Sequence, residues 1–107
     1  MGMDLKPVDF SVVAEEGCFV YCYLRESDLT PYYVGIASRA ERPTAGHNVG
    51  IPVDKSRIRL MKAGLSWDEA CLWEQRYISH YGRKDIGTGI LRNLTDGGDG
   101  TLGLVQS

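Results

Sequence analysis

The sequence predicts a single mixed domain of strands and helices (α/β, of the α+β type), with the elements in the order strand, strand, helix, helix, strand. Three observations indicate this class. The run Cys18–Leu24 is rich in β-forming residues and contains no Gly or Pro. Residues 66–82 carry an apolar stripe of helical period, and Gly- and Pro-containing segments separate the elements. A chain of 107 residues without repeats or a linker is expected to form one domain with a substantial core.

The first strand, Cys18–Leu24, is expected to lie in the centre of a sheet. Side chains alternate between the two faces of a strand, and both sets are apolar here. Residues 26–31 are polar and turn-like, and Tyr32–Ile36 is expected to form the second arm of a hairpin. The two sets of the first strand are Phe19, Tyr21 and Tyr23 on one face and Val20, Cys22 and Leu24 on the other.

A short helix is predicted next, after a loop over residues 39–52 that contains two prolines. Asp54 is suited to cap it, Lys55–Ala63 would form its body, and Gly64 would end it. Its apolar side chains, Ile58 and Met61, would then face the core, and its basic side chains would form a polar face.

The second helix is predicted with more detail. Ser66 and Glu69 have the spacing of a capping box, and the helix is expected to run to about Tyr81 and stop at Gly82. Glu74 lies in the middle of its apolar stripe, where a carboxylate is costly unless a metal ion, a cation or hydrogen bonds compensate its charge. The stripe consists of Ala70, Cys71, Tyr77, Ile78 and Tyr81.

The last part of the chain is expected to contain one more element. Residues 83–89 are predicted to be loop, and Ile90–Leu94 is predicted to form a third, short strand. Residues 95–100 form a glycine-rich turn that leads into the C-terminal tail.

Composition and cysteine content argue against a membrane or secreted protein. The longest apolar run, residues 18–24, is too short to cross a bilayer, and residues 1–17 mix charged with apolar side chains, so neither a membrane span nor a signal peptide is expected. The three cysteines are an odd number. Cys18 and Cys22 are too far apart on one strand to form a disulfide, which favours a reducing, cytoplasmic setting.

The charges are unevenly distributed along the chain. The net charge of −2 gives no general attraction to nucleic acid. Residues 39–92, however, carry ten basic and six acidic side chains, whereas residues 1–38 carry two basic and six acidic ones. The basic middle segment would suit phosphate groups, and an ordinary solvated surface is the equal alternative.

An ordered set of polar residues and short motifs suggests a function. It resembles the GIY-YIG nuclease superfamily, with Phe19-Val20-Tyr21 and Tyr33-Val34-Gly35 in place of the two motif tripeptides and the two motif tyrosines twelve residues apart. The resemblance covers about residues 18–103. It continues through Arg39, Arg42, Glu74, Tyr77-Ile78, Tyr81-Gly82, Leu91, Asn93 and Asp96-Gly97-Gly98.

The resemblance implies a three-stranded antiparallel sheet flanked by helices and a metal-dependent endonuclease that hydrolyses phosphodiester bonds, usually in DNA. Glu74 would hold Mg²⁺ (or Mn²⁺), and such an ion often keeps several waters, so one carboxylate suffices. Tyr21 would be the general base, with Tyr33 orienting Tyr21 or the attacking water. Tyrosine is a poor base near neutral pH, so Arg42 or Arg39 would have to lower its pKa while binding the phosphate.

Further residues have roles under the same resemblance. Arg42 is favoured over Arg39 because its distance from Gly35 fits the family better. Asn93 would position the surroundings of Glu74 or the substrate strand, and His47 would be a second proton-transfer group, a phosphate contact or an ordinary loop histidine. A glycine at position 35 would let the backbone lie close to the bound phosphate.

Two other functional classes remain open. The chain is alternatively a nucleic-acid-binding module without cleavage, or a structural and interaction domain in which Glu74 pairs with Arg76 or Arg92. Because no separate DNA-binding domain is expected, a nuclease of this size would read a short site, cut with low sequence demand, or take its specificity from a partner or from a homodimer.

Overall fold

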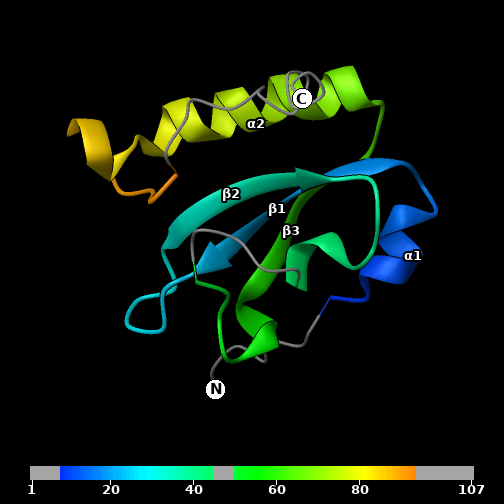
Figure 1. The fold of residues 1–107 in the computed structure, drawn as a ribbon, viewed down its shortest axis with the longest axis horizontal. Coiled ribbons are helices and arrows are strands. Elements are labelled where there is room, and N and C mark those ends of the chain that lie inside the picture. The colour runs from blue at the N-terminus through cyan, green and yellow to red at the C-terminus, as the bar shows by residue number, and fades with distance from the viewer. Residues whose placement is uncertain (1–7, 45–49, 94–107) are drawn as a thin grey trace.

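A three-stranded antiparallel sheet forms the centre of the protein, with strands in the order β2-β1-β3. The structure, a computed structural model, describes residues 8–44 and 50–93. The strands are β1 (Cys18–Leu24), β2 (Pro31–Ala37) and β3 (Ile58–Leu65). The helix α2 (Trp67–Tyr81) packs along the sheet, mainly against β2 (Figure 1). The predicted class, an antiparallel three-stranded sheet flanked by helices, is therefore confirmed.

The predicted hairpin is confirmed, with β1 as the central strand. β1 and β2 pair antiparallel, which places Tyr21 opposite Gly35 and Tyr23 opposite Tyr33. The connecting turn is closed by a hydrogen bond from the Arg25 N–H to the carbonyl oxygen of Thr30 at 2.8 Å. β1 is buried over five consecutive residues, as expected for a strand that is covered on both faces.

The predicted helix over Lys55–Ala63 is wrong, because most of this segment is the strand β3. Asp54 does cap a helical turn, accepting a hydrogen bond from the Ser56 N–H at 2.9 Å, but that turn is the single 3₁₀ turn Lys55–Arg57. Ile58 is already extended, with φ −94° and ψ 112°. The segment then pairs antiparallel with the free edge of β1.

Two irregularities in the β1–β3 pairing explain why the strand pattern of β3 was hidden. The register shifts between Cys18 and Val20 and again between Val20 and Tyr21. Each shift inserts an extra residue, which moves the following side chains to the other face and breaks the period of two. Gly64, expected to end a helix, instead has φ 71° within the strand, a backbone conformation that suits glycine at a bulge.

The helix α2 confirms the second helical prediction. The Ser66 side chain accepts a hydrogen bond from the Glu69 N–H at 3.1 Å, and the Glu69 carboxylate accepts one from the Ser66 N–H at 2.9 Å. This reciprocal pair is the predicted capping box. The helix ends where Gly82, with φ 75°, donates to the carbonyl oxygen of Ile78 at 2.7 Å.

The two ends of the described chain differ from expectation. A short helix, α1 (Phe10–Ala14), precedes β1 and was not predicted; Asp9 caps it by accepting from the Ser11 N–H at 3.1 Å. The predicted third strand Ile90–Leu94 is wrong over its described residues, since Leu91 forms only an isolated bridge with Arg83. Position 94 lies outside the described residues.

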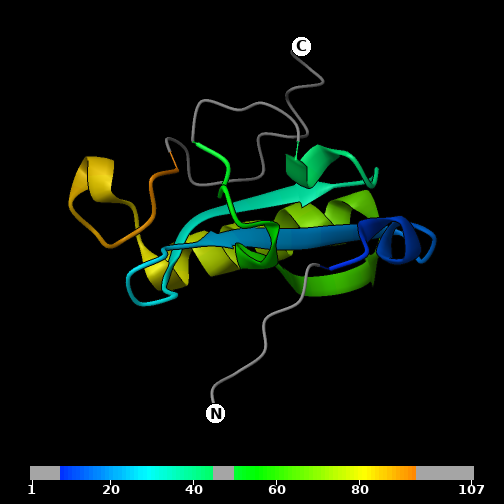
Figure 2. The same ribbon diagram turned by 90° about the horizontal axis from the view of Figure 1, so that it is seen from below.

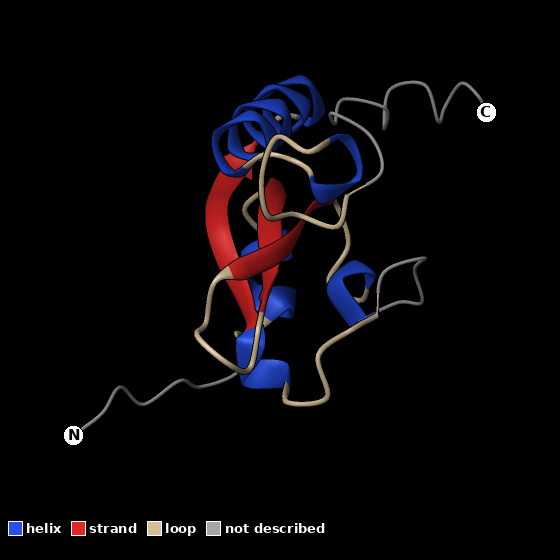
Figure 3. Cartoon of the chain, turned by 90° about the vertical axis from the view of Figure 1, so that its left-hand side faces the viewer, coloured by secondary structure: helices blue, strands red, loops and turns tan. Residues whose placement is uncertain are grey.

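The sheet separates two apolar clusters. One lies between the sheet and α2 and includes Val20, Val34, Ile36, Ala70 and Ile78. The other, on the opposite face, contains the aromatic side chains of β1 together with Phe10 and Ile58. The views in Figures 2 and 3 show the sheet with α2 along it and α1 beside the strand ends. Within the described ranges, no helix is long and apolar enough to cross a membrane.

Candidate functional site

Three tyrosines meet on the sheet face that carries the aromatic cluster. Tyr21 and Tyr23 are two positions apart on β1, so they share a face, and the hairpin register places Tyr33 beside them. The ring centroids of Tyr21 and Tyr33 are 6.2 Å apart, and those of Tyr21 and Tyr23 are 5.7 Å apart. Tyr23 and Tyr33 stack at 5.0 Å with an interplanar angle of 26°. These three residues are called the phenol cluster below.

Gly35 makes room for the phenol cluster. A Cβ atom at this position would lie 2.6 Å from the hydroxyl oxygen of Tyr21 and 2.9 Å from the ring of Tyr33. Such distances are shorter than van der Waals contact, so the Tyr21 ring lies directly over the glycine. The structure thus gives this glycine a role that was not expected: it accommodates a motif tyrosine, the one opposite it in the hairpin.

The expected lowering of the Tyr21 pKa is not found. Tyr21 is fully buried, and burial raises the pKa of its phenol, as do the neighbouring phenols of Tyr33 and Tyr23. The positive charge of Arg42 lowers this pKa, but burial has the larger effect. The buried phenol is therefore protonated at neutral pH and is suited to donate a hydrogen bond rather than to accept a proton.

Tyr33 is the phenol of the cluster that is only half-buried. Burial raises its pKa, and so does the negative charge of Glu74; the positive charge of Arg42 and hydrogen bonding with Tyr21 lower it. Glu74 lies on α2, Arg42 follows β2, and Tyr33 lies on β2. Charges from two different elements thus act on one phenol that solvent reaches.

Glu74 is half-buried, as its place within the apolar stripe of α2 predicts. The arginines considered as its ion-pair partners lie over aromatic rings: the guanidinium of Arg76 is 5.3 Å from the Trp73 ring centroid, and that of Arg92 is 6.0 Å from the Tyr32 ring centroid. Glu74 belongs to α2, which packs on the sheet face opposite the phenol cluster, and its negative charge nevertheless raises the pKa of Tyr33.

Arg42 is held beside the cluster by a main-chain anchor. It begins the 3₁₀ turn Arg42–Thr44, whose second residue, Pro43, is buried. The hydroxyl of Tyr23 donates a hydrogen bond to the carbonyl oxygen of Pro43 at 2.8 Å. The charge of Arg42 lowers the pKa values of Tyr21, Tyr23 and Tyr33 alike. These relationships support Arg42 over Arg39 as the arginine of the site.

Asn93 makes a contact with the main chain that was not predicted. Its Oδ1 accepts a hydrogen bond from the Val34 N–H at 3.0 Å, and its Nδ2 donates to the Val34 carbonyl oxygen at 2.9 Å. The carboxamide thereby pairs with the main chain of β2, the edge strand, while the Arg92 N–H donates to the Tyr32 carbonyl oxygen at 2.6 Å. Asn93, 6% exposed, therefore fixes the strand that carries Tyr33 and Gly35.

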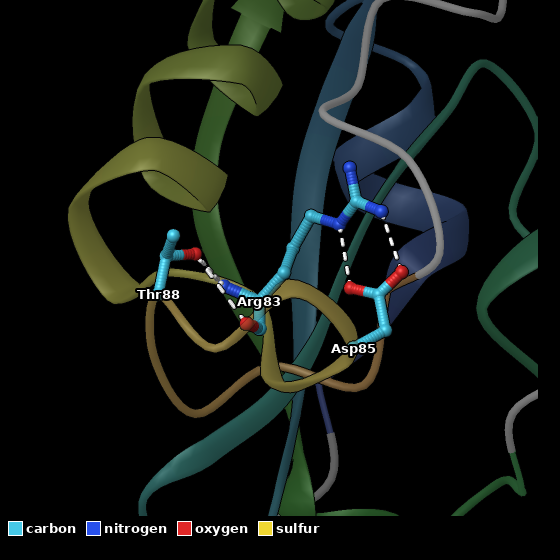
Figure 4. A network of polar contacts seen from close by, with 3 residues as sticks. All are labelled: Arg83, Asp85 and Thr88. Carbon is cyan, nitrogen blue, oxygen red and sulfur yellow. Dashed lines mark hydrogen bonds and ion pairs between the residues drawn. The ribbon is translucent and has the colours of Figure 1, made fainter.

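A polar network formed by Arg83, Asp85 and Thr88 follows α2 (Figure 4). Arg83 donates from Nε to Asp85 Oδ1 at 2.9 Å and forms an ion pair with the same carboxylate at 2.5 Å. The Arg83 N–H donates to the hydroxyl of Thr88 at 2.9 Å, which closes the loop. The chain then returns past the helix end, where the Leu91 N–H donates to the Gly82 carbonyl oxygen at 2.8 Å.

The remaining candidates have less defined positions. Arg39 is exposed and lines, together with Arg42, a cavity of about 300 Å³ beside the end of β2. His47 and the motif Asp96-Gly97-Gly98 lie outside the described residues. The basic side chains of residues 55–62 belong to β3 and its preceding turn, not to a helix face; Lys62, for example, lies 4.6 Å from the Trp73 ring centroid.

The carboxylate of Glu74 is a ligand type that suits a hard cation. Mg²⁺ keeps several waters when it is bound, so a single protein carboxylate is compatible with it. No group of three or more His, Cys, Asp and Glu side chains with metal-binding geometry occurs within residues 8–44 and 50–93.

Two residues of the site were not singled out from the sequence. Tyr23 shares the face of Tyr21, so the alternation of β1 already placed it there, but its bond to Pro43 joins residues 20 positions apart. Trp67 lines the cavity next to Arg42, and only the folding of the loop after β2 onto the start of α2 reveals this.

Comparisons with known proteins add no relative: no family model, no curated protein and no solved structure matches the chain.

Proposed function

We propose that this protein is a metal-dependent endonuclease of the GIY-YIG type that hydrolyses phosphodiester bonds in DNA. The observation that carries the proposal is the convergence on Tyr33: a carboxylate from α2 (Glu74) and a guanidinium from the turn after β2 (Arg42) both act on this half-buried phenol. Phosphodiester hydrolysis needs a cation site, a phosphate clamp and a proton acceptor close together.

The roles follow from exposure and charge. Glu74 would hold Mg²⁺ or Mn²⁺. When bound, the ion would polarise a phosphoryl oxygen, stabilise the leaving oxygen and replace the negative field of the carboxylate at Tyr33 with a positive one. Arg42 would clamp the phosphate by charge-assisted hydrogen bonds.

We propose a different division of roles between the two motif tyrosines from the one that the family resemblance implies. Because Tyr21 is 0% exposed, its hydroxyl does not meet bulk water, whereas Tyr33 is only half-buried. We therefore assign orientation of the attacking water to Tyr33. Its pKa is raised in the protein alone, so Tyr33 would accept the proton of the water only after a bound cation and Arg42 had lowered that pKa and the phenol had lost its own proton to solvent. Tyr21 would support Tyr33 through the hydrogen bond between the two phenols.

Plasmid nicking tests this function. We expect supercoiled DNA to be nicked with Mg²⁺ or Mn²⁺, and nicking to stop in EDTA and in the variants Glu74→Gln and Tyr33→Phe. Glu26→Gln is the matched control, because Glu26 is an exposed carboxylate in the β1–β2 turn. Cleavage that persists in EDTA or in Glu74→Gln contradicts the metal mechanism. The plasmid is free of RNA, so any nicking that is observed is cleavage of DNA.

A second candidate is a DNA-binding module without cleavage, and the raised phenol pKa values favour it. Salt-dependent gel shifts without nicking under any divalent ion would identify this function. In either case we place the protein in a reducing cytoplasm, consistent with its free thiols at Cys18, Cys22 and Cys71. Sequence specificity would come from a partner protein or a homodimer.

A further inference from the structure

A cavity lies between the end of β2 and the start of α2, with Arg42 in its wall. Its volume is about 300 Å³. The loop after β2 contributes Arg39, Glu41 and Arg42 to its wall, and α2 contributes Trp67, its first residue. The charge of Arg42 also acts on Tyr33 of the phenol cluster. A phosphate bound by Arg42 would therefore lie at the wall of this cavity.

The lining indicates what kind of group enters. Trp67 is half-buried, packed against the core cluster under α2 while it also lines the cavity, so it presents an indole to the occupant. An indole favours a flat, aromatic group. Arg39 and Arg42 favour negative charge, but the carboxylate of Glu41 beside them disfavours a phosphate inside the cavity. A planar base with phosphates on either side satisfies all four side chains.

The volume and the charges of the cavity also indicate whether a base would enter it paired or unpaired. A volume of this size is at the lower limit of small-molecule pockets, which span about 300–1,000 Å³, so it suits one base and not a base pair. A base reaches such a pocket only when it is unpaired and unstacked. A carboxylate accepts a hydrogen bond from the exocyclic amine of cytosine, whereas the same edge of thymine presents an acceptor oxygen.

We propose that this cavity binds the unpaired base of the nucleotide next to the scissile phosphate, with the base stacked on Trp67 and its exocyclic amine bonded to Glu41. This inference rests on the proposed nuclease function and names its substrate class: DNA with a single-stranded or extruded nucleotide at the cleavage position, with cytosine preferred over thymine.

Tryptophan fluorescence provides the test, because the chain contains only Trp67 and Trp73. Trp73 lies on α2 beside Lys62 and Arg76, apart from the cavity lining. In Trp73→Phe, Trp67 is the reporter; Trp67→Phe is the matched control. The probes are hexadeoxycytidylate, hexadeoxythymidylate and an abasic hexamer, in EDTA so that no cleavage occurs, with binding followed separately by the anisotropy of a labelled end.

We expect hexadeoxycytidylate to quench Trp73→Phe and not Trp67→Phe, and to bind about tenfold more tightly than hexadeoxythymidylate. Glu41→Gln, a change at an exposed residue, is expected to reduce that preference to about twofold or less without preventing folding. The abasic hexamer is expected to bind without quenching.

The possible outcomes distinguish failure of the base pocket from failure of the proposed nuclease function. Nicking activity together with unchanged Trp67 fluorescence at saturating hexadeoxycytidylate overturns the base pocket and leaves the nuclease standing. Quenching with a cytosine preference that Glu41→Gln removes, but no nicking under any divalent ion, supports the pocket and overturns the nuclease. Absence of both binding and nicking overturns both.

Discussion

The hydroxyl of Tyr23 donates a 2.8 Å hydrogen bond to the main-chain carbonyl oxygen of Pro43. Tyr23 is fully buried on β1, and Pro43 is the buried residue that follows Arg42. A single phenol thus joins the central strand to the turn that carries the site arginine. Arg42 itself is exposed, so the position of its side chain depends on how firmly its neighbour Pro43 is anchored.

Tyr23→Phe is expected to displace Arg42 without removing any proposed catalytic group. The change leaves the Pro43 carbonyl oxygen buried without its donor, which costs about 1–3 kcal/mol of unfolding free energy. We expect the nicking rate constant to fall about tenfold or more, because the phosphate clamp loses its orientation. Urea unfolding and single-turnover nicking measure the two effects.

A double-mutant comparison shows whether Tyr23 acts through Arg42. In an Arg42→Ala background, Tyr23→Phe should no longer reduce the rate, although it should still reduce stability. Tyr32→Phe is the matched control, since the Tyr32 hydroxyl donates to the Gly50 carbonyl oxygen at 2.6 Å. Equal rate losses in both backgrounds would mean that Tyr23 affects activity by another route.

Gly35→Ala is expected to destabilise the sheet and disturb both motif tyrosines. The new methyl group would meet the hydroxyl of the fully buried Tyr21 at 2.6 Å, so the ring would have to shift within the packed core. Overpacking of this kind costs about 1–3 kcal/mol. Thermal or urea unfolding measures the loss.

Gly50→Ala is the matched control for that substitution. A Cβ atom at Gly50 would have nothing within 4 Å, and its φ is not positive, so we expect a change in unfolding free energy close to zero. Similar effects of the two substitutions would show that loss of glycine flexibility, and not the contact with Tyr21, determines the result.

Asn93→Ala is expected to loosen the edge strand β2. It removes both hydrogen bonds to Val34, and the buried main-chain groups left without partners cost about 1–3 kcal/mol. Asn93→Asp keeps the acceptor for the Val34 N–H but loses the donor to its carbonyl oxygen, so its effect should also be destabilising. Unfolding free energies compare the two variants.

Amide hydrogen exchange locates the effect of the Asn93 substitutions. The Val34 N–H should exchange faster in Asn93→Ala, whereas the Leu91 N–H, bonded to the Gly82 carbonyl oxygen, should change less. Unchanged protection at Val34 would contradict the assignment of Asn93 to the strand edge.

Alkaline pH is expected to destabilise the protein. Burial raises the pKa of the Cys22 thiol from 9.0 to about 11, partly opposed by Arg59, and burial also raises the pKa values of Tyr21 and Tyr23 above 10.0. Between the unfolded and folded pKa values the unfolded chain binds fewer protons, so stability is complete below about pH 9 and falls as the pH rises. Each such group contributes a slope of about 1.4 kcal/mol per pH unit.

Urea unfolding from pH 8 to 11 measures this loss. Cys22→Ala should reduce the slope between pH 9.0 and about 11, the window set by the thiol, whatever its effect at neutral pH. Tyr21→Phe should reduce the slope only above pH 10.0. An unfolding free energy that stays constant up to pH 11 would mean that these groups have the same pKa values in the folded and the unfolded protein.

Local sequence was sufficient to predict those strands and helices whose determining residues all lie within one segment of the chain. The alternation of β1, the hairpin to β2, and α2 with its capping box at Ser66 and Glu69 all follow from neighbouring residues, and all are confirmed. The half-buried position of Glu74 follows in the same way from the helical period. The residues of the site could be named because they lie at recognisable spacings on these elements.

Tertiary structure decided what depends on contacts between distant segments. β3 is a strand because it pairs with the open edge of β1, and its two register shifts hide the alternation that would reveal it. Asn93 completes β2 only after the loop beyond α2 has folded, and the burial that raises the pKa of Tyr21 comes from both the sheet and the residues packed on it. Residue types and spacing determine helix and strand propensity, whereas burial, register and charge proximity arise only when the whole chain is packed.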